Sequence, residues 1–187
     1  MVSATAIPAL LDGKADLVAA ALEITDERSK QIDLSPVYFR TGQRILVKKD
    51  DTTINDVADL ARKTVCTVRG SPSERTVVAR STEARLLSVD TYEACLAALQ
   101  QGAADAVSAD ETTLFGLVRQ DPSTKIVGAY FSDIPHGIGL RKGRIGFAPF
   151  LGSVIAAMVA DGRWEALYQR HITPLSGDAK RAPPSPP

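Results

Sequence analysis

Short apolar runs alternate with amphipathic stretches along most of the chain. The runs predict strands at 15–22, 32–34, 37–39, 43–49, 64–68, 84–89, 104–109, 125–130 and 136–142. The amphipathic stretches predict helices at 3–12, 69–80, 91–102, 110–121, 146–162 and 163–172. Strands that alternate with helices of about a dozen residues are typical of an α/β fold with mainly parallel sheets. The continuous apolar run at 15–22, bounded by charge, indicates a parallel strand buried on both faces.

Capping residues mark where several of these helices begin and end. Thr25 is followed by two acidic residues, which favour the positive end of a helix dipole. Thr91 and Asp110 are predicted N-caps, and Gly13 and Gly102 are predicted stops. These signals fix the expected helix boundaries independently of the apolar pattern.

Composition excludes several classes of partner. The 187 residues suffice for one large domain or two small lobes, and Lys plus Arg equals Asp plus Glu at 22 each. A nucleic-acid-binding protein usually carries a basic excess or stripe, so we expect no nucleic-acid partner. No apolar run approaches the roughly 18 residues that a membrane helix needs, and no signal peptide is visible at Met1. The proline-rich segment 176–187 is expected to be a disordered tail.

The residues that could carry metal or redox chemistry are few. Cys66 and Cys95 are the two cysteines, and their count alone favours buried reduced thiols over a disulfide. His136 and His171 lack Cys, Asp or Glu neighbours at metal-ligand spacing, so we expect them to be structural. The sequence therefore predicts neither a metal site nor a cofactor. Trp164, four residues before a tyrosine on the last helix, indicates a core stripe.

Four stretches in their order and spacing carry a resemblance to a known family: 10–49, 65–73, 92–122 and 137–172. Together they resemble the polar amino-acid solute-binding proteins of ABC transporters, which have the type 2 periplasmic binding fold. The match is most similar to the actinobacterial glutamine-, glutamate- and aspartate-binding lipoproteins, and it covers residues 1–173. The resemblance implies two α/β lobes with parallel-rich sheets, joined by two crossovers.

The resemblance also implies a division of the chain. The expected parts are lobe one at 1–47, lobe two at 48–137, a return to lobe one at 138–175, and the tail at 176–187. The hinges are expected near Lys48–Lys49 and Gly137–Leu140. Family members begin lobe one with a further β-α-β segment after a signal sequence, whereas here the family pattern is already running at residue 5. We therefore expect an N-terminally truncated chain or a misplaced start, with a natural minimal version as the alternative. An incomplete lobe one would expose sheet edges and apolar surface and weaken ligand binding.

The function implied by the resemblance is capture of a polar amino acid of the glutamate, glutamine, aspartate and asparagine class. The protein would work outside the cytoplasm as a monomeric, membrane-anchored lipoprotein that delivers the amino acid to an ABC permease. One alternative is an amino-acid sensor domain that feeds a membrane signalling partner. A second alternative is an enzyme similar to prephenate or arogenate dehydratases. No G-x-S-x-G or H-E-x-x-H motif and no isolated catalytic histidine is present, so we expect a binding protein rather than an enzyme.

Two charged residues are the first candidates for ligand contacts. The resemblance implies that Arg28 holds the ligand α-carboxylate, because a planar guanidinium matches a carboxylate with two parallel hydrogen bonds. The alternative for Arg28 is a surface arginine in a polar helix. The resemblance implies that Asp110 pairs with the ligand α-ammonium at the carboxyl edge of a sheet, where α/β proteins bind ligands. Asp110 can serve as an N-cap at the same time.

The turn formed by Gly70, Ser71, Pro72 and Ser73 is the next candidate. In the family this turn opens a helix whose N–H groups and hydroxyl meet the carboxylate, as anions commonly do at helix N-termini. Pro72 fits the first helical position but removes one N–H donor. We expect Ser71 in particular, with Gly70 and Ser73, to contact the ligand. A phosphate-binding P-loop is excluded because no Lys-Ser/Thr follows at the required spacing.

Ala21 and Glu23 lie where the family offers backbone groups and a hydroxyl to the ligand carboxylate. A carboxylate at Glu23 would repel that group. Either Glu23 turns away, for example onto Arg28, or the ligand differs from a standard α-amino acid. The resemblance further implies a disulfide between Cys66 and Cys95, which would stabilise the fold by roughly 3–4 kcal/mol in the chain-entropy model. Such a bond fits an oxidising compartment outside the cytoplasm.

Overall fold

A computed structural model of the chain describes residues 3–176. The chain divides into two compact units, Met1–Arg40 with Ile134–Pro187 and Thr41–Asp133. Among the helices described, none has the length and apolar character needed to cross a membrane. Apart from Ser176, the predicted tail at 176–187 lies outside the described residues.

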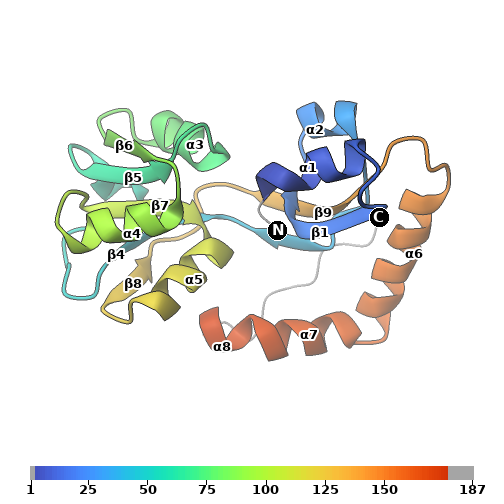
Figure 1. The fold of residues 1–187 in the computed structure, drawn as a ribbon. Coiled ribbons are helices and arrows are strands. Elements are labelled where there is room, and N and C mark those ends of the chain that lie inside the picture. The colour runs from blue at the N-terminus through green and yellow to red at the C-terminus, as the bar shows by residue number, and fades with distance from the viewer. Residues whose placement is uncertain (1–2, 177–187) are drawn as a thin grey trace. The chain divides into compact units, whose positions relative to one another are not determined.

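The first unit is built on a small antiparallel sheet (Figure 1). Its strands are β1 (Leu17–Glu23), β2 (Asp33–Leu34), β3 (Phe39–Thr41) and β9 (Ile134–Leu140). The order is β1-β9-β2, with β3 also paired to β9, and both β1 and β2 run antiparallel to β9. The predicted parallel direction of the strand at 15–22 is therefore wrong. The apolar run at 15–22 does not mean that the strand is buried on both faces. Val18 and Leu22 are buried, whereas Ala19, which is small and apolar, is exposed.

Two helices near the N-terminus flank this sheet. Helix α1 (Ser3–Leu11) buries Ala6 and Leu10 against a cluster contributed by β1 and by Ile32. Helix α2 (Asp26–Gln31) begins after Thr25, whose hydroxyl accepts a hydrogen bond from the backbone N–H of Arg28 at 3.3 Å. The predicted cap at Thr25 is confirmed, and it fixes the start of the helix that carries Arg28.

The remaining helices of the first unit follow β9. They are α6 (Phe147–Ala160), α7 (Arg163–His171) and α8 (Thr173–Ser176). On α7 the buried rings of Trp164 and Tyr168 stack with centroids 5.4 Å apart. The indole Nε1 of Trp164 donates to the carbonyl of Tyr38 at 2.7 Å, which confirms the predicted core stripe. Helix α6 is apolar apart from Ser153, yet it buries only Gly152 and Ile155, and Phe150 remains 58% exposed.

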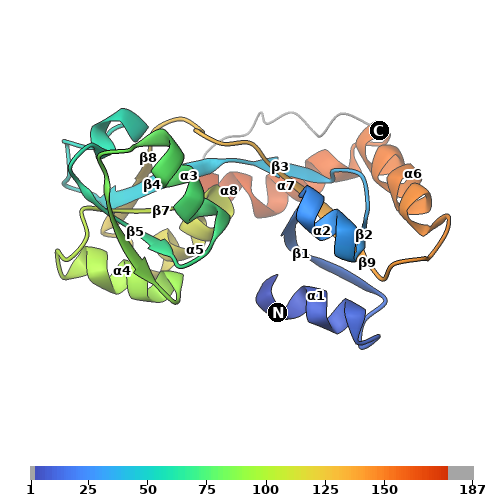
Figure 2. The ribbon, with the colours of Figure 1, turned by 90° about the horizontal axis from the view of Figure 1, so that it is seen from above.

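The second unit is a five-stranded sheet with helices on both faces (Figures 1 and 2). In chain order its elements are β4 (Gln43–Lys48), the 3-10 helix η1 (Val57–Leu60), β5 (Thr64–Val68), α3 (Pro72–Arg80), β6 (Arg85–Val89), α4 (Tyr92–Gln100), β7 (Ala106–Asp110), α5 (Glu111–Gln120) and β8 (Thr124–Val127). The strand order is β6-β5-β7-β4-β8. Strand β5 runs parallel to β6 and β7, whereas β4 runs antiparallel to β7 and β8. The predicted α/β alternation is confirmed, and the parallel direction holds for β5, β6 and β7.

Two apolar clusters bind the helices to this sheet. One face buries Cys66 and Val107 against α4 and α5. The other face buries Val65 and Ala106 against Val77 of α3 and against η1. Because side chains alternate between the faces of a strand, neighbouring residues of β5 and β7 serve opposite clusters. The two layers of helices thus hold the strand ends, and the loops that follow them, in place.

The chain passes between the units at Arg40–Thr41 and at Asp133–Ile134. These positions differ from the hinges expected at Lys48–Lys49 and Gly137–Leu140. Strand β4 pairs with β7 and β8, so residues 43–47 lie in the sheet of the second unit instead of the expected first lobe. Gly137 and Leu140 lie inside β9, where pairing with β1 and β2 holds them in the first sheet. The ladder hydrogen bonds of these strands explain the difference.

Candidate functional site

Three helices begin at one edge of the second sheet, because α3, α4 and α5 each follow one of the parallel strands β5, β6 and β7. Their N-caps are Ser71, Thr91 and Asp110. Each cap side chain accepts a hydrogen bond from a backbone N–H three residues on, at 3.2, 3.1 and 3.1 Å respectively. The predicted caps at Thr91 and Asp110 are confirmed. Helix N-termini carry partial positive charge, so this edge favours an anionic group.

The phenol of Tyr92 lies among the candidate ligand residues of this edge. Its hydroxyl donates to the Oγ of Ser73 at 3.4 Å, and it also interacts with Ser71 and with the charge of Asp110. Burial raises the pKa of Tyr92, and the negative charge of Asp110 adds to that increase, while hydrogen bonding with Ser73 and Ser71 opposes it. The structure therefore places Ser73 at the Tyr92 hydroxyl, with Ser71 and the charge of Asp110 near enough to affect its pKa.

Tyr92 is a candidate that the sequence interpretation missed. It is the first residue of α4, directly after the N-cap Thr91. The available signal was its position at the start of a helix that follows a parallel strand. Residues there lie at the carboxyl edge of the sheet, where ligands bind.

The carboxylate of Asp110 is held firmly at the end of β7. Its Oδ1 accepts the backbone N–H of Thr113 at 3.1 Å and the hydroxyl of Thr112. Its Oδ2 accepts the hydroxyl of Thr113 at 2.5 Å. An ionised carboxylate has about four acceptor sites, so these three bonds leave capacity for a further donor. The role of Asp110 as a ligand contact stays a prediction, and the geometry allows it.

Hydrogen bonds within residues 70–74 stabilise the turn that opens α3. Gly70 has φ of +68°, and its N–H donates to the Oε2 of Glu74 at 2.7 Å. Glu74 also accepts the hydroxyl of Ser88, and these two hydrogen bonds lower the pKa of Glu74, the bond from Ser88 more strongly. Pro72 takes the first helical position, as predicted. The N–H of Gly70 is engaged by Glu74, and the role of Gly70 as a ligand contact stays a prediction.

A buried glutamine supports the same turn from β4. The side-chain Nε2 of Gln43 donates to the carbonyl of Ser73 at 2.9 Å and to the Oγ of Ser108 at 2.7 Å. Gln43 is 1% exposed. Buried amide groups are costly unless they are hydrogen-bonded. The bond to Ser73 holds α3 against β4, and the bond to Ser108 fixes the amide beside β7. The sequence interpretation did not single out this residue.

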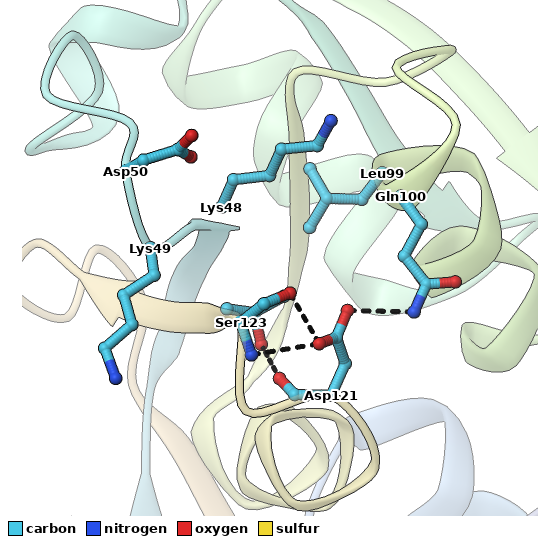
Figure 3. Close-up of a pocket in the computed structure, with 8 residues that line it drawn as sticks. Lys48, Lys49, Asp50, Leu99, Gln100, Asp121 and Ser123 are labelled. Carbon is cyan, nitrogen blue, oxygen red and sulfur yellow. Dashed lines mark hydrogen bonds between the residues drawn. The ribbon is translucent and has the colours of Figure 1, made fainter.

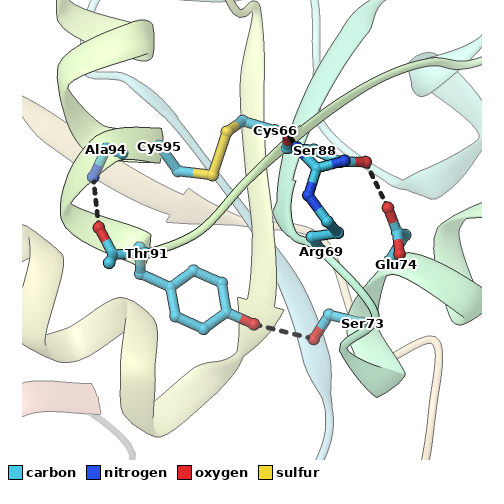
Figure 4. Close-up of a disulfide and its surroundings, with 9 residues drawn as sticks. Cys66, Arg69, Ser73, Glu74, Ser88, Thr91, Ala94 and Cys95 are labelled. Atoms are coloured by element: carbon cyan, nitrogen blue, oxygen red, sulfur yellow. Dashed lines mark hydrogen bonds between the residues drawn. A yellow bond between two sulfur atoms is a disulfide. The ribbon is translucent and has the colours of Figure 1, made fainter.

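A disulfide joins Cys66 of β5 to Cys95 of α4, with the Cα atoms 5.4 Å apart (Figure 4). The disulfide implied by the family resemblance is confirmed, and the reduced thiols favoured by the count alone are not found. Both cysteines are fully buried. The bond closes a loop that contains the turn 70–73 and the start of α4, so it ties Ser73 and Tyr92 to one covalent framework.

The first unit holds the other predicted ligand residues. Arg28 is half-buried on α2, and its Nη1 donates to the backbone carbonyl of Glu23 at 2.8 Å. Glu23 ends β1 and lies opposite His136 of β9. Ala21 lies within β1, and its side chain is not among those described. The anchoring of Arg28 to a backbone oxygen leaves its other guanidinium N–H groups to meet an anion.

A separate pocket of about 590 Å³ lies in the second unit where α4 and α5 end (Figure 3). Its lining residues are Lys48, Lys49, Asp50, Leu99, Gln100, Asp121, Ser123 and Thr124. Hydrogen bonds from Ser123 and from Gln100 lower the pKa of Asp121. None of the predicted ligand residues lines this pocket, and it lies at the ends of the helices opposite to their N-caps. Within residues 3–176, no group of three His, Cys, Asp or Glu side chains could hold a metal ion.

A family profile and individual bacterial proteins both match most of this chain. The profile of the bacterial extracellular solute-binding proteins, family 3, matches residues 1–174. The ABC transporter glutamine-binding protein GlnH of Bacillus subtilis is 34% identical over 171 residues, which is 91% of this chain and 62% of GlnH. The glutamate-binding protein GluB of Corynebacterium glutamicum is 32% identical over 168 residues, which is 86% of this chain and 57% of GluB.

A solved protein structure is also similar to most of this chain. An ancestral arginine-binding protein bound to glutamine superposes with a TM-score of 0.77 and 36% identity, covering 92% of this chain and 77% of that protein. The chain spans less than two thirds of the length of each of the two sequence relatives, GlnH and GluB.

Proposed function

Because the chain belongs to family 3 of the bacterial extracellular solute-binding proteins, we propose that it captures a polar amino acid for an ABC transporter. The resemblance and the α/β periplasmic binding fold predicted from the sequence are confirmed. The family and these relatives are solute-binding proteins and not enzymes. The observation that carries the proposal is the sheet edge where three helices begin, with Ser71 and Asp110 as N-caps and Ser73 hydrogen-bonded to Tyr92.

The proposed ligand is a zwitterion of the glutamine, glutamate, aspartate and asparagine class. Asp110 would bind the α-ammonium, because a carboxylate with acceptor capacity to spare is the natural partner of three N–H donors. Arg28 would bind the α-carboxylate through paired hydrogen bonds. The relatives named glutamine-binding and glutamate-binding support this ligand class. The hydroxyls of Ser71 and Tyr92 would add donors for a carboxylate or a side-chain amide.

Glu23 is the predicted ligand residue whose type departs from the family pattern. Its backbone oxygen holds Arg28, and its carboxylate lies at the position where the family has a hydroxyl. Every amino acid of this class carries the α-carboxylate that Glu23 would face, so repulsion there would weaken the binding of all of them. The solved neighbour bound to glutamine is consistent with an amide ligand.

Isothermal titration calorimetry with the purified chain tests the proposal. The panel is L-glutamine, L-glutamate, L-aspartate, L-asparagine and L-arginine. We expect saturable binding of glutamine, and we expect Arg28→Lys to weaken it by roughly one hundredfold, since a fully paired charge contact contributes about 2–3 kcal/mol. Arg170→Lys, at an exposed position of α7, is the matched control and should bind as the parent does. Absence of heat with every amino acid would reject the proposal.

The proposed setting is outside the cytoplasm, with the protein anchored as a monomeric lipoprotein that delivers its amino acid to a permease subunit. The buried disulfide supports an oxidising compartment. Labelling of intact cells with an impermeant amine reagent, followed by purification of the protein, tests the location. Sedimentation equilibrium of the purified protein tests the monomeric state.

A further inference from the structure

A buried carboxylate lies directly after Asp110 and takes no part in the site described above. Glu111 is the first residue of α5, and its residue surface is 4% exposed. Its Oε1 lies 2.8 Å from the Nη1 of Arg44, and its Oε2 accepts a hydrogen bond from the hydroxyl of Tyr130. Both carboxylate oxygens of Glu111 are therefore engaged by groups from other elements.

The same residues connect α5 to the chain segments 42–44 and 128–132. The backbone N–H of Glu111 donates to the carbonyl of Gly42 at 3.0 Å. The Nε of Arg44 donates to the carbonyl of Gly128 at 2.8 Å. The ring of Tyr130 lies against Gly42, where an added Cβ would come within 2.5 Å of the tyrosine Cγ. These contacts join the first turn of α5 to both segments at once.

Stability alone does not explain why this charge is buried. Replacing a buried ion pair with well-packed apolar residues is often neutral or stabilising, so such a pair is weak evidence for a role in stability. A charged network does specify one geometry, because each hydrogen bond restricts distance and direction. Here the restricted element is the turn whose N-cap is Asp110.

We propose that Glu111 is a positioning residue that, with Arg44 and Tyr130, fixes the direction in which the carboxylate of Asp110 points. The proposal rests on the proposed function of Asp110 as the partner of the ligand ammonium. Loss of either contact to Glu111 would let the first turn of α5 reorient while the helix stays folded. The ligand would then meet a misdirected carboxylate and bind more weakly.

The test uses Glu111→Gln and Tyr130→Phe in the full chain, with Glu83→Gln as the matched control. Glu83 forms an exposed ion pair with Arg62 at 3.3 Å in the same unit. Amide hydrogen exchange by NMR follows three N-cap reporters: the amides of Thr113 on α5, Ala94 on α4 and Glu74 on α3. Calorimetry with L-glutamine follows ligand affinity.

We expect exchange at Thr113 to become roughly tenfold faster in both test variants, with Ala94 and Glu74 unchanged, because each variant weakens a hydrogen bond to a charged group. We expect glutamine affinity to fall by a similar factor. An unchanged Thr113 would overturn the proposal, as would equal acceleration at all three reporters, which indicates general loosening. Should Glu111→Gln fail to fold, Tyr130→Phe decides, since it keeps the ion pair. If the parent binds no amino acid while Thr113 responds alone, the proposed function fails and the positioning role stands.

Discussion

The side-chain amide of Gln43 and the backbone carbonyl of Ser73 are joined by a hydrogen bond of 2.9 Å. The bond runs from the first residue of β4 to the first turn of α3, and the same Nε2 also donates to Ser108 of β7. One buried side chain thus sets the position of the turn that carries Ser71 and Ser73 relative to two strands. The shape of the candidate site depends on this link as much as on the residues that would touch a ligand.

Replacement of Gln43 by methionine tests the link. Methionine keeps the length of the side chain but leaves the carbonyl of Ser73 without its donor, so we expect the free energy of unfolding to fall by about 1–3 kcal/mol. Gln100→Met is the control, because Gln100 is exposed and its side chain bonds only to the half-buried Asp121 among the contacts described. That variant should change the free energy by less than about 0.5 kcal/mol. Urea denaturation of both variants gives the comparison, and equal losses would contradict the prediction.

Removal of the disulfide should destabilise the second unit. The double variant Cys66→Ala and Cys95→Ala releases a closed loop of sequence separation 29, and we expect the free energy of unfolding to fall by about 3–4 kcal/mol in the chain-entropy model. Urea denaturation with and without a phosphine reductant checks this. The reductant should lower the stability of the parent and leave the double variant unchanged. A parent that is indifferent to reductant under denaturing conditions would argue against the bond.

Tyr92 should give the protein a distinct alkaline dependence. Its pKa is raised above the ordinary value of 10.0, chiefly by burial and further by Asp110. The neutral phenol is therefore the form that the fold favours, so its contribution is complete below pH 10 and is lost as pH rises through the raised value. We expect the stability difference between the parent and Tyr92→Phe to be constant from pH 8 to pH 10 and to shrink above that range. A difference that does not change with pH would show that Tyr92 titrates normally.

Two glycines of the second unit should respond to alanine in opposite directions. A Cβ at Gly42 would lie 2.5 Å from Cγ of Tyr130 and 2.6 Å from the carbonyl oxygen of Ser132, so we expect Gly42→Ala to cost about 1–3 kcal/mol. Gly116 lies inside α5 with no atom within 4 Å of an added Cβ, so Gly116→Ala should stabilise by about 0.5–1 kcal/mol. Thermal denaturation separates the two. Tolerance of alanine at Gly42 would mean that Tyr130 can leave its position on the backbone.

Local signals predicted the features that depend on neighbouring residues. Thr25, Thr91 and Asp110 were identifiable as caps because an N-cap acts on the backbone three residues away. The disulfide followed from a family resemblance, since two cysteines alone do not specify pairing. The direction of β1 was predicted wrongly because its partner is β9, where Leu17 lies opposite Leu140. The local sequence around β1 does not show which strand far along the chain will pair with it.

The interior polar contacts were beyond sequence reasoning for a similar reason. Gln43 looks like an ordinary strand residue, and Tyr92 and Glu111 look like ordinary first-turn residues of helices. Their roles come from partners that only the fold supplies: Ser73 for the first two and Arg44 with Tyr130 for the third. The residue types alone indicate which hydrogen bonds these side chains can form. The partners are set by the fold, for example by the pairing of β4 with β7.

The interleaved connectivity of the two units also sets an order of events during synthesis. The second unit is one continuous segment, whereas the first unit is completed only when β9 reaches β1. Contacts between residues distant in sequence form slowly, because a long loop must close before they form. During synthesis on the ribosome, the second unit, which contains the three helix N-termini, can therefore fold before β9, the partner strand of β1, has been made. Until β9 is synthesised, β1 lacks the strand with which it pairs, and an unpaired strand edge is prone to aggregation.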